Sequence, residues 1–499
     1  MTSPVSATRP AGRRGPLPLA LDAHSGLPLF QQISSAIVTA IRRGRLRPGD
    51  RLPGSRTLAV SLVVNRNTVI AAYDELAGEG WIESSTARGT FVSRSLPEFR
   101  PKAFTRAAAG RAEVPEATGF DFQATPADRE AWQPGKPPVF AISLGAPDVR
   151  LTPVDLLARA YRRAIRRHTE SVLKYGHTGG HPALRQALAS MLAATRGLAT
   201  SAEDVLITSG SQMALELLGR TLLRKGDVVA VEQIGYRPAW NAFQQHGAKV
   251  VPIPVDSGGM DVEALTRLVQ RTPVRALYVT PHHQYPTTAT LTAGRRIALL
   301  ELARKLRIAI IEDDYDHEYH YEGRPILPLA SVDRAGVVIY VGTLAKVIAP
   351  GIRLGYVAAP RPLLESMAAH RHIIDRQGDH TLEYAVAELI EDGGVQRHAR
   401  RARRVYQSRR DSLVGVLRTE FADTLSFNVP AGGIAVWARA AAGIDVDAWG
   451  ERVARQGVAM LTAKYYAFDE RPRPFIRFGF ASLTEEEMGE ALGRLRKTL

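Results

Sequence analysis

The chain of 499 residues contains no cysteine. Disulfide bonds, catalysis by a thiolate and zinc sites with cysteine ligands are therefore excluded. No apolar run approaches the roughly 20 residues that a transmembrane helix needs, so we expect no membrane partner. Lysine is absent from the first 100 residues, which hold 13 arginines against 7 acidic residues. A reducing cytoplasm is the location that fits a chain without cysteine.

The remaining composition is that of a basic globular protein. The formal net charge is +15 at pH 7, and 45% of the residues are hydrophobic and 23% charged. The first 100 residues carry more positive charge per residue than the rest. A basic balance favours a polyanionic partner, with nucleic acid as the first candidate. The length predicts two or three domains.

Composition and periodicity divide the chain into four parts. Residues 1–16 resemble a flexible tail, and residues 17–93 alternate helix and turn signals compactly. Residues 94–138 are rich in Pro, Ala and Arg, which is typical of a linker. Strands and helices alternate over residues 139–499, which predicts an α/β domain with a mostly parallel sheet covered by helices on both faces. We expect a smaller C-terminal α+β subdomain from about residue 380.

The region 17–93 has the pattern of a helical module that binds DNA. A helix near Phe30 is followed by a short helix at Ser55–Leu62, and Asn65 is a good N-cap for a third helix that runs to about Glu79. The first turn of this third helix, from Asn65 to Thr68, is polar. Such side chains at the start of the second helix of a helix-turn-helix suit base edges and phosphates in a major groove.

Two short strands predicted at Trp81–Glu83 and Gly89–Val92 surround a polar turn with Arg88 and form a wing. With Gly49-Asp50-Arg51-Leu52-Pro53-Gly54-Ser55-Arg56 and Asn65-Arg66-Asn67-Thr68-Val69, this region resembles the winged helix-turn-helix of GntR-type bacterial regulators. The resemblance implies double-stranded DNA as the partner. The residues that we expect at the DNA are Arg56, Asn65, Arg66, Asn67, Thr68, Arg88 and Gly89.

Lys346 stands directly after a buried strand predicted at residues 337–341. A lysine at such a position can form a Schiff base with a carbonyl cofactor. Thr343, three residues before it, and Arg353, seven after it, can hold a phosphate. This segment resembles the Schiff-base segment of fold type I enzymes that depend on pyridoxal phosphate (PLP).

Further segments suit the same cofactor. The small residues of Thr208-Ser209-Gly210-Ser211-Gln212 join a strand to a helix, where backbone N–H groups can face a phosphate. Asp313 ends a strand, and its carboxylate can pair with a pyridinium nitrogen and keep it protonated. Tyr315 can hydrogen-bond the ring oxygen, and Tyr236 can stack on the ring. Tyr175 could reach a phosphate, in such folds usually that of the partner subunit.

Taken together, the chain resembles the MocR/GabR-like regulators, which fuse a GntR-type winged helix to a class I aminotransferase-like domain. The resemblance covers about residues 17–93 and 140–485. It implies a homodimer in which Lys346 carries PLP and Asp313 and Tyr315 contact the ring. The phosphate ligands that it implies are Ser211, Gln212, Thr343 and Arg353.

Two functions stay open at this point. The first is a transcriptional regulator that senses PLP, or an amine or amino-acid effector whose carboxylate Arg477 would clamp. The alternative is an active aminotransferase with an accessory DNA-binding module. Tyr285 stands where aminotransferases have an asparagine, and this departure argues mildly against efficient transamination.

No metal site is expected from the sequence. His177 and His181 have a spacing seen in metal sites, but the two glycines between them favour a loop over a helix. The adjacent pair His282 and His283 also falls in a predicted loop. We interpret all four as polar loop residues.

Overall fold

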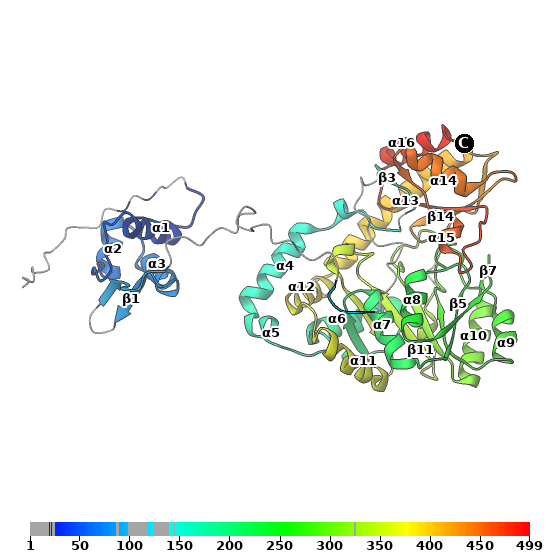
Figure 1. The fold of residues 1–499 in the computed structure, drawn as a ribbon, viewed down its shortest axis with the longest axis horizontal. Helices are drawn as coiled ribbons and strands as arrows, with labels where there is room; N and C mark the ends of the chain where they lie inside the picture. The colour runs from blue at the N-terminus through cyan, green and yellow to red at the C-terminus, as the bar shows by residue number, and fades with distance from the viewer. Residues whose placement is uncertain are drawn as a thin grey trace, which may run out of the picture. The chain divides into compact units, whose positions relative to one another are not determined.

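The computed structural model (Figure 1) describes residues 19, 21, 25–85, 89–97, 118–122, 139–143, 145–323 and 326–499. The chain forms two compact units, Met1–Ala131 and Trp132–Leu499. The boundary between them falls inside the predicted linker, whose greater part lies outside the described residues, as does the predicted tail. None of the helices in the described ranges is both long and apolar enough to cross a membrane.

The N-terminal unit contains three helices and a two-stranded wing. Helices α1 (Leu29–Arg42), α2 (Ser55–Leu62) and α3 (Arg66–Gly78) are followed by β1 (Ile82–Ser85), which pairs antiparallel with β2 (Gly89–Val92). Apolar residues at helical spacing close a small core between the three helices. Its fully buried members include Ile33, Ile37, Leu58, Val69 and Leu76. The predicted winged helix-turn-helix is confirmed.

The second unit is built around a seven-stranded sheet in the order β4-β12-β11-β10-β9-β5-β6. All strands run parallel except β12, which is antiparallel to both of its neighbours. The predicted mostly parallel sheet is confirmed, while β12 was not predicted. The strands are β4 (Val205–Thr208), β5 (Val228–Glu232), β6 (Lys249–Ile253), β9 (Val274–Val279), β10 (Ala309–Asp314), β11 (Val338–Thr343) and β12 (Gly355–Ala358).

Helices cover both faces of this sheet because alternate strand residues face opposite sides. In β5, Val229 and Val231 pack with α7, α8 and α11, whereas Val228 and Ala230 pack with α9 and α10. Helices α6 and α12 cover the β4 end of the second face. The helices are α4 (Val154–Arg167), α5 (Thr169–Leu173), α6 (Pro182–Arg196), α7 (Ser211–Leu222), α8 (Arg237–Gln245), α9 (Val262–Val269), α10 (Ala293–Leu306), α11 (Arg361–Ile374) and α12 (His380–Glu391).

A smaller subdomain follows the sheet (Figure 1). Its antiparallel sheet has the order β13-β14-β16 and is covered by α13, α14 and α16. Helix α12 still packs on the large sheet, and the first part of α13 does so too, through Val395 and Ala399. The packing therefore changes inside α13, rather than at residue 380. The elements are α13 (Gly394–Glu420), β13 (Leu425–Phe427), β14 (Ala435–Ala440), α14 (Val446–Arg455), β15 (Val458–Ala459), α15 (Ala463–Tyr466), β16 (Phe475–Gly479) and α16 (Glu485–Arg496).

A buried carboxyl on α12 makes the stability of this unit depend on pH. Oε2 of Glu383 accepts the backbone N–H of His181 at 2.5 Å, and Oε1 has no hydrogen-bond partner within the described ranges. Burial raises the pKa of Glu383 to about 7. The folded chain therefore holds a proton that the unfolded chain, with a Glu pKa of about 4.3, has already released.

Replacing Glu383 with glutamine should remove this pH dependence. The contribution of Glu383 is fully present below about pH 4.3 and is lost as the pH rises through about 7. Between about pH 5 and 7, the unfolding free energy of the wild type relative to the variant should fall by up to about 1.4 kcal/mol per pH unit. Urea unfolding across this range measures the difference. Glu301→Gln, an exposed change on α10, is the control, and a pH-independent difference for Glu383→Gln would contradict the prediction.

Candidate functional site

The main site lies where β10 and β11 end. The two strands are parallel neighbours, with Asp313 opposite Val341, so their carboxyl ends meet at one edge of the sheet. Lys346 follows three residues after the end of β11. Its Nζ donates a hydrogen bond to the backbone oxygen of Gly145 at 2.6 Å. Burial, and next the positive charge of Arg477, lower the pKa of Lys346 to about 8, which makes this amine easier to deprotonate than an exposed lysine.

Arg477 on β16 brings the small subdomain to the same place. Its side chain is 1% exposed, and Nη1 donates to the backbone oxygen of Ser143 at 2.9 Å. A Cβ at Gly145 would lie 2.7 Å from Nη2 of Arg477, so a larger residue there would displace the guanidinium. Among the described residues no carboxylate forms an ion pair with this guanidinium, and its Nε has no hydrogen-bond partner. A buried guanidinium without a carboxylate partner is a favourable binding site for the carboxylate of a small molecule.

Asp313 is buried with one oxygen free. The hydroxyl of Tyr278 donates to its Oδ2 at 2.7 Å, whereas Oδ1 has no partner in the described part of the chain. Burial raises the pKa of this carboxyl to about 7, although Tyr278 and Lys346 both act to lower it. The sequence did not single out Tyr278. Tyr278 lies on β9 and is paired with Ile311 of the neighbouring strand β10. Only this strand register could have indicated that Tyr278 lies close to Asp313.

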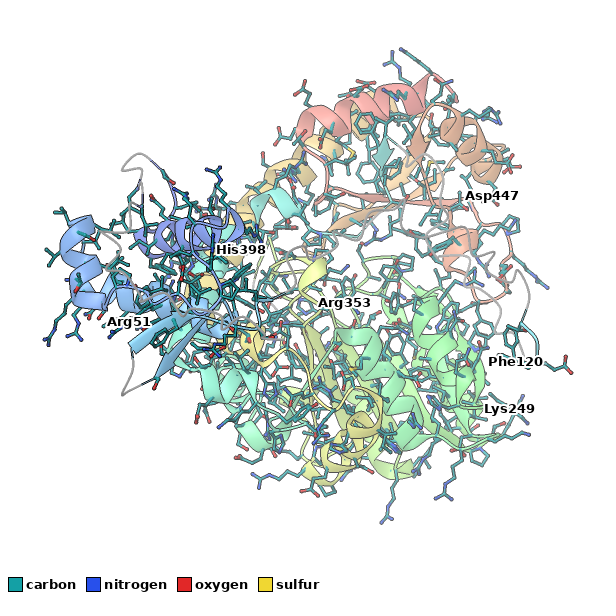
Figure 2. The ribbon with its side chains drawn as sticks, turned by 60° about the vertical axis from the view of Figure 1, so that its left-hand side comes forward. Arg51, Phe120, Lys249, Arg353, His398 and Asp447 are labelled. Atoms are coloured by element: carbon teal, nitrogen blue, oxygen red, sulfur yellow. The ribbon has the colours of Figure 1, made fainter. Side chains whose placement is uncertain are left out.

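A second group of residues forms a small cup around the start of α7. Gly210 has a φ of +83° and caps this helix. A Cβ at Gly210 would lie 2.8 Å from Nη2 of Arg353, which donates to the backbone oxygen of Ser209 at 2.9 Å. Figure 2 labels Arg353, which precedes β12. The guanidinium and the first turn of a 12-residue helix therefore meet, as in many phosphate sites.

The other predicted phosphate ligands lie on these same segments. Thr343 is the last residue of β11, and its Oγ1 accepts the backbone N–H of Ala345 at 3.1 Å. Ser211 is the first residue of α7. Gln212 donates from Nε2 to the backbone oxygen of Pro238 at 3.1 Å, while its Oε1 is buried and has no partner among the described residues.

Three tyrosines form a row next to Arg477. The ring centroid of Tyr285 lies 5.6 Å from that of Tyr236 and 6.0 Å from that of Tyr315, both edge to face. The Cζ of Arg477 lies 5.1 Å from the centre of the Tyr285 ring. Tyr175 differs from the other candidates because its side chain is 78% exposed and its ring stacks on Arg376. No described contact joins Tyr175 to the pocket.

The predicted DNA-contacting residues lie on α2, at the start of α3 and in the wing. Arg56, Asn65, Arg66 and Asn67 are exposed, and Thr68 is partly buried. Oδ1 of Asn65 accepts the backbone N–H of Asn67 at 2.8 Å, so the predicted cap forms. Nε of Arg66 lies 3.4 Å from Oγ of Ser55 on α2.

The base of the wing adds a residue that the sequence analysis did not select. Gly89 has a φ of +98°, and a Cβ there would lie 3.2 Å from Nη2 of Arg51. Arg51, labelled in Figure 2, is exposed, and its backbone forms an isolated antiparallel β-bridge with Phe91 of β2. Its guanidinium therefore joins the candidate surface through a contact between positions far apart in the sequence. Arg88 lies outside the described residues.

Comparisons with known proteins agree with this two-part organisation. Residues 29–92 match the family described as bacterial regulatory proteins, gntR family, and residues 141–495 match the family described as aminotransferase class I and II. The chain is 33% identical over 484 residues to the probable rhizopine catabolism regulatory protein MocR of Rhizobium meliloti, covering 96% of this chain and 95% of that one. It is 32% identical over 403 residues to the pyridoxine biosynthesis transcriptional regulator PdxR of Corynebacterium glutamicum, covering 80% and 81%.

A solved structure resembles the second unit. The α-aminoadipate aminotransferase LysN of Thermus thermophilus, complexed with N-(5'-phosphopyridoxyl)-L-leucine, has a TM-score of 0.67 and 27% identity and covers 72% of this chain and 92% of that one. The fold family therefore implies PLP. The residues of the site fit this group, because Asp313 has a free buried oxygen and Gly210, which has no Cβ, lets the Arg353 guanidinium lie against the start of α7. The chain belongs to the MocR-like family, in which a gntR-type DNA-binding domain is fused to an aminotransferase class I and II domain.

Proposed function

We propose that this protein is a cytoplasmic transcriptional regulator that binds DNA through its N-terminal unit and PLP through its aminotransferase-like unit. The observation that carries the proposal is the presence, in one chain, of the exposed polar first turn of α3 and of a pocket with Lys346, Asp313 and Arg353. The names of the MocR and PdxR relatives support regulation of transcription. Bound PLP would supply an electron sink for chemistry on an amine.

Each residue of the pocket has a proposed role. Lys346 would hold the cofactor covalently, Asp313 would pair with its ring nitrogen, and Tyr315 and Tyr236 would contact the ring. The phosphate would be bound by Arg353, together with Gly210, Ser211, Gln212 and Thr343. We propose that the protein is a homodimer and that Tyr175 reaches the phosphate held by the partner subunit.

The signal would be PLP itself or an amine or amino acid that enters beside it. Arg477 supports an amino acid, because its buried guanidinium has no carboxylate partner in the described part of the chain. Either signal must stabilise one arrangement of the protein over another in order to change DNA binding.

An active aminotransferase is the second candidate. The chain is 31% identical over 366 residues to the aromatic-amino-acid aminotransferase 1 of Thermococcus litoralis, covering 72% of this chain and 88% of that one. An aminotransferase activity of this kind would not explain why the chain also carries a gntR-type unit. Steady turnover with an amino donor and a keto acid would favour the enzyme, while a single half-reaction would favour the regulator.

The test is DNA binding by the full chain at one stated salt concentration, with and without PLP, on DNA flanking its own gene. Arg66→Ala should weaken specific binding by about 1–3 kcal/mol, or about 5–150-fold, because an arginine at the start of a recognition helix can read a base. Arg220→Ala removes the same charge from an exposed position on α7 and is the matched control. Equal affinity of the wild type and Arg66→Ala would reject this role of Arg66, and absence of specific binding would favour the enzyme.

A further inference from the structure

Four histidines gather beside the cofactor pocket on two loops. His282 and His283 follow β9, and His317 and His320 follow β10. These strands are parallel neighbours, with Glu312 opposite Val279, so the loops after them leave the same edge of the sheet. The ring centroid of His282 lies 4.3 Å from that of His283 and 4.7 Å from that of His317.

Three of these side chains converge on one point. His282, His283 and His320 each offer one nitrogen, and the three nitrogens lie within 4.8 Å of one another. His282 and His283 are each 4% exposed, and His320 is partly buried. Three imidazoles brought this close, with little access to water, form a compact set of nitrogen donors.

The nitrogens of this set lack the partners that buried histidines normally have. Both ring nitrogens of His282 are buried without a hydrogen-bond partner within the described ranges, and those of His320 have none with good geometry, although the backbone of Glu322 lies near that ring. Nearly all buried polar atoms in proteins are paired, so the unpaired nitrogens of His282 and His320 leave room for a further partner, which a metal would provide to one nitrogen of each ring. Because imidazole is the commonest protein ligand of transition metals, a metal ion is the partner that this chemistry favours.

His283 carries the arrangement that usually orients a metal ligand. Its Nδ1 lies 2.8 Å from Oδ1 of Asp316, which is 1% exposed. A carboxylate at this distance holds the proton on Nδ1 and leaves the lone pair of Nε2 for a metal. Metal-ligating histidines almost always donate their other ring N–H to a carboxylate, a backbone carbonyl or a water molecule.

We propose that His282, His283 and His320 bind a divalent transition-metal ion, with Asp316 orienting His283. An all-nitrogen set suits Zn²⁺, Co²⁺, Ni²⁺ or Cu²⁺ and does not suit Mg²⁺ or Ca²⁺, which prefer oxygen. Three protein ligands leave a fourth position open for water or a small molecule. A cavity of about 250 Å³ has His317 and His320 in its wall.

A second set of atoms competes with the first. His282, Asp314 and His317 also offer ligand atoms within 4.8 Å of one another. Oδ2 of Asp314, however, already accepts the hydroxyl of Tyr340 at 2.7 Å and lies 2.9 Å from Nδ1 of His317. Oδ1 of Asp314 also lacks a partner within the described ranges, but Asp314 and His317 already contact each other. No such contact satisfies His282 or His320 among the described residues, so a metal gains more at the three-histidine set.

This site goes beyond the proposed regulator. His282 and His283 do lie in a loop, as the sequence predicted, but the proposal makes them metal ligands, which the sequence analysis did not expect. His317 and His320 were not considered from the sequence at all. His317 and His320 lie more than 30 residues after His283 in the sequence, on a different loop. Sequence motifs for metal sites rely on short spacings and therefore do not detect such a set. The site also stands independently of PLP, because none of its proposed ligands is a proposed cofactor ligand.

The test is metal binding by the full chain without added PLP. The protein is stripped with a chelator, incubated with Zn²⁺ or with Co²⁺ as a coloured probe, and desalted. We expect about one zinc ion per chain by elemental analysis, and visible absorption of Co²⁺ typical of nitrogen ligation. His320→Gln should weaken binding at least about 10–100-fold, the loss that even an outer-shell change typically causes.

Three variants make the result specific. His372→Gln, an exposed change on α11, should bind like the wild type. His317→Gln should also retain binding, whereas loss in this variant alone would overturn the three-histidine assignment. Asp316→Asn should weaken binding by about 10–100-fold and serves if His320→Gln does not fold, as judged by circular dichroism. Absence of retained metal in the wild type, or equal binding by wild type and His320→Gln, would overturn the proposal.

Discussion

Replacing Lys346 with alanine is expected to abolish covalent attachment of PLP. The Nζ of Lys346 lies at the carboxyl ends of β10 and β11, and burial and Arg477 lower its pKa to about 8. At pH 7 roughly a tenth of such an amine is neutral and able to attack a carbonyl, against far less than a hundredth for an exposed lysine with a pKa of about 10.4. Alanine leaves no nucleophile in its place.

The measurement is mass spectrometry after incubation with PLP and reduction with borohydride. The wild type should carry one phosphopyridoxyl group on the peptide that contains Lys346, and the variant should carry none there. Lys249→Ala, which removes an exposed lysine of β6, is the control and should be labelled like the wild type. The N-terminal unit has its own core, so Lys346→Ala should keep the fold of the DNA-binding unit. Covalent labelling of the variant at wild-type yield would contradict the assignment.

Sequence periodicity predicted the parts of the fold that short segments determine. Helix α2 begins and ends at the predicted residues Ser55 and Leu62, and α3 starts after the predicted cap Asn65. The strand predicted at residues 337–341 corresponds to β11, Val338–Thr343, because buried parallel strands form apolar runs between turn signals. Helices and strands of this kind can be predicted because their patterns depend only on residues that are close together in the sequence.

Features that depend on distant segments were missed. The strand β12 has only four residues, Gly355–Ala358, and its antiparallel place between β4 and β11 follows from tertiary packing. Helix α12 buries polar residues, such as Thr381 and Glu383, together with apolar ones, so its sequence alone did not predict that it packs on the large sheet.

The same limit applies to the candidate site. Motifs indicated Lys346, Thr343 and Arg353, because these residues lie within one short segment. Tyr278 meets Asp313 from the neighbouring strand, and Arg51, from the segment between α1 and α2, meets Gly89 at the start of β2. These contacts depend on how strands pair and how the chain folds back on itself. The pattern of residues in a single sequence does not predict either.

Replacing Asp313 with asparagine is expected to weaken PLP binding strongly. The free oxygen Oδ1 is buried, and with a pKa of about 7 the carboxyl is mostly ionised at pH 8, where it can pair with a protonated ring nitrogen. Asparagine keeps the size of the side chain but cannot carry this charge. A charge-assisted hydrogen bond contributes about 1.5–3 kcal/mol, so the dissociation constant should rise about 10–150-fold.

A cofactor analogue makes this prediction specific to the ring nitrogen. The measurement is equilibrium dialysis at pH 8 with PLP and with an analogue that has carbon in place of that nitrogen. The wild type should prefer PLP by about 10–150-fold, whereas Asp313→Asn should bind the two nearly equally, which isolates the pair as a double-mutant cycle does. Tyr278→Phe should reduce the preference less, because Asp313 keeps its charge and loses only the hydrogen bond that orients it. An unchanged preference in Asp313→Asn would place the ring nitrogen away from Asp313.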